Sequence, residues 1–511
     1  MPEKYYDVVV IGRSIGALAA AALLSRRDFT VLVVGHGRPS ADYEFDGVGL
    51  RRRGFTMLAA RSPSWRRLTS ELAWTQTWNR RTTPLDPMLQ VLMAGHRLNV
   101  PPDAEHFGRE VEREFPAWRR RVADLYGNFA RVTAAADEAF GEEAQWPPGT
   151  FFERRRTARL ASSLPYAQAE PHADLLAEFP RHHPYRRVVD ATVRFGTDLA
   201  APVPAFAVAR LHGSWTRGLV AVPGGEDALT SMLLERVEAN GGVHFAGDRI
   251  ARLDVRRGNV CHVTVDGDEA PVGAGWVLTD VSGEALAGLA GGGGVSKRAQ
   301  REWPRVVPTT GRFVVSLVVR RRGLPEPLAQ EFFLLDEGGA ALHVERSPAA
   351  GISDAELLVA EVLRGERDRL PRERMRAHVV ARLCAELPFL ERHLLIVDSP
   401  HDGLPLWRYR REGATVARPA LVPRTHLTGG HVRAEPMVRQ FEVDPVGYLG
   451  LAGEPLRGPL PRTLLVGPTV LPGLGQEGQL LAAWGATRLV TQSDRRKARM
   501  RREMWTKLEI T

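Results

Sequence analysis

The chain has 511 residues, of which 44% are hydrophobic and 25% are charged, as in an ordinary globular protein. This length exceeds what one hydrophobic core usually holds, so we expect two domains. The formal net charge is +9, but only four of the 69 basic residues are lysines and the arginines are scattered. Because a nucleic-acid footprint is a clustered basic surface, no nucleic-acid partner is expected.

The two cysteines, Cys261 and Cys384, form no CxxC pair. This excludes a disulfide scaffold and a cysteine metal site, and it favours a reducing cytoplasm. The apolar runs are too short for a membrane span, and the N-terminus is typical of a strand rather than a signal peptide. We expect a soluble cytoplasmic protein. The basic run Arg495–Arg502 leaves open peripheral contact with an anionic membrane, with a solvated helix as the alternative.

The chain begins with a predicted βαβ unit. The β-branched run Tyr6–Ile11 predicts a strand buried on both faces of a parallel sheet. A glycine turn follows, then a helix over Ala17–Arg26 and a second buried strand over Thr30–Val34. This order is that of a dinucleotide-binding unit.

The turn reads GRSIGA, a degenerate dinucleotide fingerprint. Gly12 keeps the first glycine, which makes the tight turn, whereas Ser14 replaces the second, where the backbone approaches the pyrophosphate. Ala17 replaces the third glycine, and Gly16 stands beside it. The amides of the following helix, from Ile15 on, still point at an anion. The pattern therefore predicts a weakened phosphate site that is not abolished.

A second departure lies at the end of the second strand. The fingerprint has an acidic residue there for the ribose hydroxyls, and this chain has Gly35 followed by His36. Loss of a charge-assisted acceptor costs about 1.5–3 kcal/mol. Asp42 or Glu44 is an alternative acceptor. His36 and Arg38 could instead hold a 2′-phosphate.

The later elements alternate between helix and strand. Residues 61–205 are predicted to be mostly helical, including Ala104–Phe115. A Pro-Gly-Gly segment then precedes a helix over Glu226–Asn240, and Gly258-Asn259 indicates a hairpin. The remaining predicted elements are the strands Ile250–Val255, Val260–Val265, Arg312–Val319, Glu331–Leu335 and Thr463–Gly467, and helices near 371–387 and over Gly478–Val490.

Four blocks of sequence resemble one flavoprotein family. They are the N-terminal βαβ unit, PLDPMLQVLMAGHRLNVPPDAEHFGREVEREFP (84–116), GLVAVPGGEDALTSMLLERVEANGG (218–242) and LLVGPTVLPGLGQEGQLLAAWGATRLV (464–490). In this order they resemble the phytoene-desaturase-like branch of the FAD-dependent amine oxidase superfamily, which includes carotenoid desaturases, carotenoid isomerases and retinol saturases. The resemblance spans nearly the whole chain.

The resemblance implies an α/β fold, in which a Rossmann-like FAD-binding domain is interleaved with a second α+β substrate domain. The implied boundaries are 1–60, 206–300 and 436–492 for the FAD-binding domain, 61–205 for a helical substrate or lid region, 301–435 for the substrate domain and 493–511 for a basic tail.

The same resemblance implies the cofactor contacts. Those beyond the βαβ unit are Ile250, on the strand that lines the adenine, and Gly467, Pro472, Gly473, Gly475 and Gly478 in the flavin-ring loop. Pro223, Gly224 and Gly225 are placed beside the substrate cavity. Two family features are altered: Pro468 removes a backbone donor, and Ser40-Ala41 stands where the family has a Gly-Gly-Arg motif.

The expected function is FAD-dependent oxidation or reduction of an extended apolar substrate such as a polyene or isoprenoid, by desaturation, saturation or isomerisation. The flavin carries such chemistry, so no catalytic acid or base is expected to stand out, and none does. The alternative is a degenerate member without flavin that binds a lipid or a partner. An NAD(P)-dependent dehydrogenase is disfavoured because it leaves the C-terminal glycine-rich loop without a role.

Several residues have both a structural and a functional interpretation. His182 and His183 suggest a metal but lack further ligands at suitable spacing, so a surface loop and no metal are expected. His426 and His431 are placed near the substrate channel or in a plain loop. The tryptophans could line an apolar tunnel or pack a helical subdomain; they are Trp65, Trp74 and Trp78.

Overall fold

The computed structural model describes residues 4–37, 39–166, 173–200, 202–245, 249–256, 259–266, 270–292, 294–295, 301–337, 340–365, 368–409, 418–445 and 447–493. Arg38 and the basic run Arg495–Arg502 lie outside these ranges. No helix in the described part of the chain is long and apolar enough to cross a membrane.

The first sheet carries the N-terminal βαβ unit. Its order is β10-β11-β12-β1-β2-β9, and β22 pairs with β12. Strands β1, β2, β9, β12 and β22 run parallel, and β10 and β11 form an antiparallel extension. The bounds are β1 (Tyr5–Ile11), β2 (Val31–Val34), β9 (Val243–Phe245), β10 (Ile250–Arg256), β11 (Asn259–Val265), β12 (Val272–Thr279) and β22 (Thr463–Leu465).

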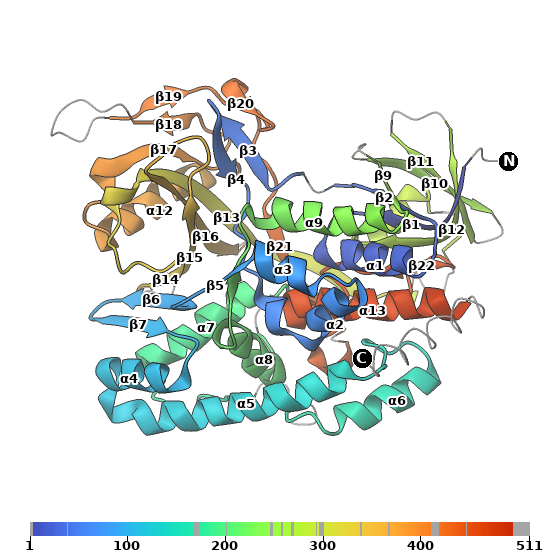
Figure 1. Ribbon diagram of the computed structural model, residues 1–511, viewed down its shortest axis with the longest axis horizontal. Helices are drawn as coiled ribbons and strands as arrows, with labels where there is room; N and C mark the ends of the chain where they lie inside the picture. Colours follow the sequence, from blue (N-terminus) through green and yellow to red (C-terminus); the bar gives the residue numbers. More distant parts are fainter. Residues whose placement is uncertain are drawn as a thin grey trace.

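Three helices pack together over this sheet, with α1 (Ile15–Arg26) between α9 (Gly225–Ala239) and α13 (Gly475–Ser493) (Figure 1). Helix α1 is mostly buried alanine and leucine, which allows close approach. A Cβ on Gly16 would lie 2.2 Å from the carbonyl oxygen of Val466, so helix and loop meet backbone to backbone. Gly16 therefore supplies the close packing that the fingerprint assigns to its third glycine.

The second sheet has the order β19-β18-β17-β13-β16-β15-β14-β6-β7, with β21 also paired to β13. It stands beside the first sheet (Figure 1). The bounds are β6 (Leu89–Met93), β7 (His96–Val100), β13 (Arg305–Arg320), β14 (Glu331–Leu335), β15 (Ala341–Pro348), β16 (Ala355–Gly365), β17 (Leu394–Asp398), β18 (Leu406–Arg408), β19 (Ala420–Val422) and β21 (Val438–Asp444). Helix α12 (Arg372–Glu386) packs its apolar side against this sheet.

A group of helices occupies the middle and lower part of the view in Figure 1. Its members are α2 (Pro63–Glu71), α3 (Thr75–Arg81), α4 (Ala104–Glu114), α5 (Arg119–Gly141), α6 (Phe151–Ala161), α7 (Pro184–Gly196) and α8 (Ala205–Thr216). The smaller elements are β3 (Asp42–Phe45), β4 (Val48–Arg51), β5 (Thr83–Pro84), β8 (Val220–Ala221), β20 (Leu427–Thr428) and α10 (Gly283–Leu289).

The fold class expected from the sequence is confirmed, and most predicted elements are found within a few residues of their expected ends. One difference concerns residues 89–100, inside the region predicted to be mostly helical. These residues form the hairpin β6–β7, and β6 pairs in parallel with β14. Four of the five residues of β6 are buried. A short run that is buried in this way is typical of a strand inside a sheet, and here it extends the second sheet.

Candidate cofactor and substrate cavity

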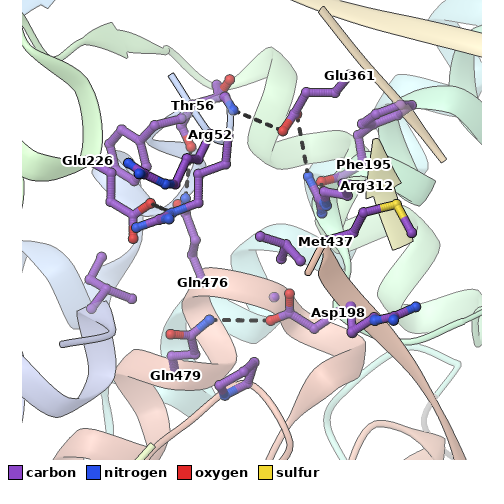
Figure 2. Close-up of a pocket in the computed structure, with 18 of the residues that line it drawn as sticks. Arg52, Thr56, Phe195, Asp198, Glu226, Arg312, Glu361, Met437, Gln476 and Gln479 are labelled. Atoms are coloured by element: carbon purple, nitrogen blue, oxygen red, sulfur yellow. Dashed lines mark hydrogen bonds and ion pairs between the residues drawn. The ribbon is translucent and has the colours of Figure 1, made fainter. Parts of the chain in front are cut away.

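A cavity of about 370 Å³ lies between the two sheets, a volume within the range of small-molecule sites. Charged and amide side chains from distant segments line it, as Figure 2 shows. They include Arg13, Arg52, Arg53, Asp198, Glu226, Arg312, His343, Glu361, Glu435, Gln476 and Gln479. The rest of the lining is apolar and includes Phe55, Leu58 and Met437, so the cavity offers both charged and apolar surface.

Three consecutive arginines, residues 51–53, pass from β4 into the wall of the cavity. All three are buried, and each is paired with a carboxylate. Nε of Arg52 lies 2.6 Å from Glu435, and Arg53 pairs with Glu226 of α9. Because buried arginines remain charged, these pairs are needed to offset their desolvation. They connect the 51–53 segment to both domains.

A buried carboxylate–imidazole–carboxylate cluster lies at one end of the cavity, and two of its members line the wall. Glu331 on β14, His343 on β15 and Glu361 on β16 project from one face of three adjacent strands. Nε2 of His343 lies 2.8 Å from Glu331, and Nδ1 lies 3.2 Å from Glu361. Thr56 donates to Glu331, and the backbone N–H of Gly54 donates to Glu361.

The cluster has a defined charge state. Burial alone lowers the pKa of His343, but the hydrogen bonds to Glu331 and Glu361 outweigh burial and raise it to about 9. Burial acts to raise the pKa of Glu361, yet His343 and Arg312 together lower it to about 2. Burial raises the pKa of Glu331. The ion pair is therefore His343 with Glu361, and Glu331 is the carboxylate that takes up a proton first.

Arg312 of β13 lies next to Glu361 at the same end of the cavity (Figure 2). Its Nη1 lies 3.8 Å from Glu361, and Nη2 donates to the carbonyl oxygen of Phe195 at 2.8 Å. Among the described residues, its buried Nε has no hydrogen-bond partner. The rings of Phe195 and Trp215 complete an apolar wall beside these charges. This end of the cavity can therefore bind a polar group against an aromatic surface.

The start of α13 forms the opposite wall. Gln476 donates to the carbonyl oxygen of Thr56 at 2.8 Å, and Gln479 donates to Asp198 at 3.3 Å (Figure 2). Between them, Glu477 points away from the cavity and forms a buried ion pair with Arg210 of α8 at 2.6 Å. This pair fixes the first turn of α13 against the helical region.

The dinucleotide turn holds a carboxylate of the chain itself. Asp280 follows β12, which pairs with β1, so its side chain reaches the turn. The backbone N–H of Ser14 donates to Asp280 at 2.7 Å, and the hydroxyl of Ser14 accepts from the N–H of Ala17 at 3.3 Å. A Cβ on Gly12, whose φ is +116°, would lie 1.9 Å from the same carboxylate. Only glycine fits at this position.

The end of β2 is covered by an arginine. A Cβ on Gly35 would lie 2.8 Å from Nε of Arg13, and Nη2 of Arg13 lies 3.3 Å from His244. His36 accepts a hydrogen bond from the N–H of Ile250 at 3.1 Å. His36 therefore binds the first residue of β10. The alternative interpretation from the sequence assigned it to a 2′-phosphate instead. Neither Asp42 nor Glu44 lines the cavity.

Two of the residues predicted from the sequence, Ile15 and Gly475, line the cavity directly, and Pro468 joins them. Gly467 packs against the backbone of Asp280, with a Cβ position 2.2 Å from its carbonyl oxygen. The others are not among the lining residues and lie in the turn, after β2, at the start of β10, in the 472–478 loop and at the start of α9. They are Gly12, Ser14, Gly16, Ala17, Gly35, His36, Ile250, Pro472, Gly473, Gly478, Pro223, Gly224 and Gly225.

The remaining candidates do not line the cavity. His183 caps α7, where Nδ1 accepts from the N–H of Tyr185, and the described residues contain no group of potential metal ligands. Neither His426 nor His431 lines the cavity. The tryptophan rings pack on one another in the core, with centroids 4.8–6.0 Å apart; they are Trp65, Trp74 and Trp78.

No protein-family model matches the chain, and a search of curated proteins finds no match. Solved structures do match it over nearly the full length. Cyclohexylamine oxidase from Brevibacterium oxydans is 17% identical with a TM-score of 0.54, covering 96% of this chain and 99% of that one. A redesigned putrescine oxidase is 15% identical with a TM-score of 0.56, covering 96% and 100%. An oxidoreductase from Methanosarcina mazei is 14% identical with a TM-score of 0.53, covering 94% and 99%.

These matches establish the fold: the chain has the two-domain FAD-binding fold of the amine oxidases. They concern the fold alone, because the identities are low. The carotenoid branch of the superfamily stays a prediction.

The cavity brings together side chains from the segments that this fold places around a cofactor. Its lining includes Leu229 and Thr230 of α9, together with Thr56 and with Gln476 at the start of α13. One conflict is of charge, at Asp280, whose carboxylate already accepts from a backbone donor of the turn. The residues that would hold the cofactor are those of the turn, of α9 and of the first turn of α13.

Proposed function

We propose that this protein is an oxidoreductase that binds FAD in the cavity and acts on a small polar substrate. The observation that carries the proposal is the course of the cavity. Its lining starts at Arg13 and Ile15, beside the dinucleotide turn, and ends at Gly475 and Gln476, at the start of α13. The resemblance assigns these two places to the pyrophosphate and the flavin ring. When bound, FAD supplies acceptance of a hydride or of electrons.

The charged end of the cavity supports a polar substrate. Glu361 and Arg312 present opposite charges there, and hydrogen-bonding groups of a ligand can pair with them. Covering these groups with a hydrocarbon chain would desolvate them without compensation. We therefore favour a substrate that carries hydrogen-bonding groups over the extended polyene expected from the sequence.

Glu361 is the residue placed to exchange a proton with such a substrate. Its carboxylate is ionised at neutral pH and borders the cavity. In this charge state His343 carries a proton on both ring nitrogens, and it donates from Nδ1 to Glu361 and from Nε2 to Glu331. A proton taken from the substrate is therefore held on Glu361 itself.

A second candidate function is a protein that keeps the fold and binds a polar ligand without flavin. The contact of Asp280 with Ser14 favours it, because a carboxylate at the turn repels a pyrophosphate.

A pair of matched variants tests the proposed function. Thr230 lines the cavity, whereas its neighbour Ser231 is exposed on the same helix. In a fluorescence titration with FAD, Thr230→Trp should weaken binding at least tenfold because the indole fills the path, and Ser231→Trp should leave it unchanged. Equal binding by both variants, or no binding of FAD by the folded protein at any concentration, would contradict the proposal.

A further inference from the structure

We infer that Asp280 is a residue that determines cofactor affinity: its carboxylate competes with the pyrophosphate of FAD for the dinucleotide turn. This inference rests on the proposed function. It concerns a residue outside the fingerprint, directly after a strand more than 260 positions further along the chain, and it starts from the contact between Ser14 and Asp280.

The carboxylate takes the place of an external anion. Dinucleotide turns bind phosphate through backbone N–H groups at the start of the helix, where the helix dipole is positive. Here Asp280 accepts from the N–H of Ser14 at 2.7 Å, and the N–H of Ala17 is satisfied by the hydroxyl of Ser14. The turn therefore already carries a negative charge and has fewer donors to offer.

The backbone holds Asp280 in this position. Its N–H donates to the carbonyl oxygen of Ile11 at 3.1 Å, which continues the pairing of β12 with β1. On the other side, the backbone of Gly467 packs so closely that a Cβ there would lie 2.2 Å from the carbonyl oxygen of Asp280. The backbone of Asp280 is fixed, and only its side chain can rotate. FAD can therefore accept a hydrogen bond from the N–H of Ser14 only if it displaces the carboxylate of Asp280.

The substitution Asp280→Asn tests the inference, because the amide keeps the shape of the side chain and removes its charge. The matched control is Asp254→Asn on β10, which also removes one negative charge from this domain; Asp254 pairs with Arg252 and does not line the cavity. Asp280→Ser serves as a second variant in case the first folds poorly, and thermal unfolding without FAD checks both.

Titration of each protein with FAD, followed by flavin fluorescence, gives the answer. We expect both Asp280 variants to bind FAD at least about tenfold more tightly than the wild type, because repulsion between like charges near a protein surface is that large. Asp254→Asn should match the wild type. Equal, measurable affinity of all four proteins would overturn the inference and leave the proposed function standing. Absence of binding by the wild type and by the folded Asp280 variants would overturn both.

Discussion

Glu331 and His343 are joined in the core of the second sheet by a 2.8 Å contact between a carboxylate oxygen and Nε2. The other ring nitrogen of His343 binds Glu361, which borders the cavity. A titratable group in the core is thus connected to the proposed substrate site through one imidazole ring.

This cluster predicts a pH dependence of stability. The pKa of His343 is raised from 6.5 to about 9, so its stabilising contribution is complete below pH 6.5 and is lost as the pH rises through 9. His343→Gln removes the group that releases the proton. We expect the free energy of unfolding, measured in urea from pH 6.5 to 9, to fall less steeply in this variant. The exposed His106→Gln is the control; an unchanged slope in His343→Gln would refute the assignment.

The ion pair between Arg210 and Glu477 predicts a large effect on stability. Both side chains are at least 94% buried, so Arg210→Met leaves an unpaired carboxylate in the core and should cost about 3–5 kcal/mol in urea unfolding. The double change with Glu477→Leu should recover much of this loss. Arg81→Ala breaks an exposed pair with Glu235 and should cost about 0–1 kcal/mol. Similar losses of unfolding free energy in Arg210→Met and Arg81→Ala would show that burial does not increase the cost of breaking the pair.

The position of Arg13 predicts how a restored ribose acceptor behaves. A glutamate at position 35 would place its carboxylate next to the guanidinium of Arg13 and pair with it. We therefore expect Gly35→Glu alone to change the affinity for FAD little. Adding Arg13→Ala should free the carboxylate and improve binding roughly tenfold to a hundredfold in calorimetry. If Gly35→Glu alone improves affinity as much as the double variant, Arg13 does not compete for it.

A variant in the tryptophan cluster tests whether these residues stabilise the core or belong to the binding site. Trp78 is buried against Trp65 and Trp74 and does not line the cavity. Trp78→Ala should lower the free energy of unfolding by about 3–5 kcal/mol and leave the affinity for FAD unchanged. A selective loss of FAD affinity with normal stability would instead indicate that the cluster belongs to the binding site.

The sequence predicted the framework of this protein better than its cavity. The strand–turn–helix at Gly12 and the helix after Gly225 follow from buried β-branched runs and glycine turns, which are local patterns. The lining comes from side chains of many segments, such as Arg312 and Glu361, which only the pairing of strands in the second sheet brings together. A single charged residue within an apolar strand run, as at Glu361, is a local signal that could have indicated this part of the lining.

The role of Asp280 could not be read from the fingerprint for a similar reason. Its place beside Gly12 depends on the parallel pairing of β12 with β1, across more than 250 residues of chain. Ser14 and Gly35 depart from the dinucleotide fingerprint in the sequence itself. The carboxylate of Asp280 at the turn is a further departure, and only the fold reveals it.

The absorption spectrum of FAD in the presence of excess protein tests the central claim most directly. We predict that wild-type protein, at concentrations that saturate binding, perturbs the visible flavin bands with one FAD bound per chain, and that Thr230→Trp does not. A spectrum identical to that of free FAD, recorded with folded wild-type protein and with folded Asp280→Asn, would contradict the account.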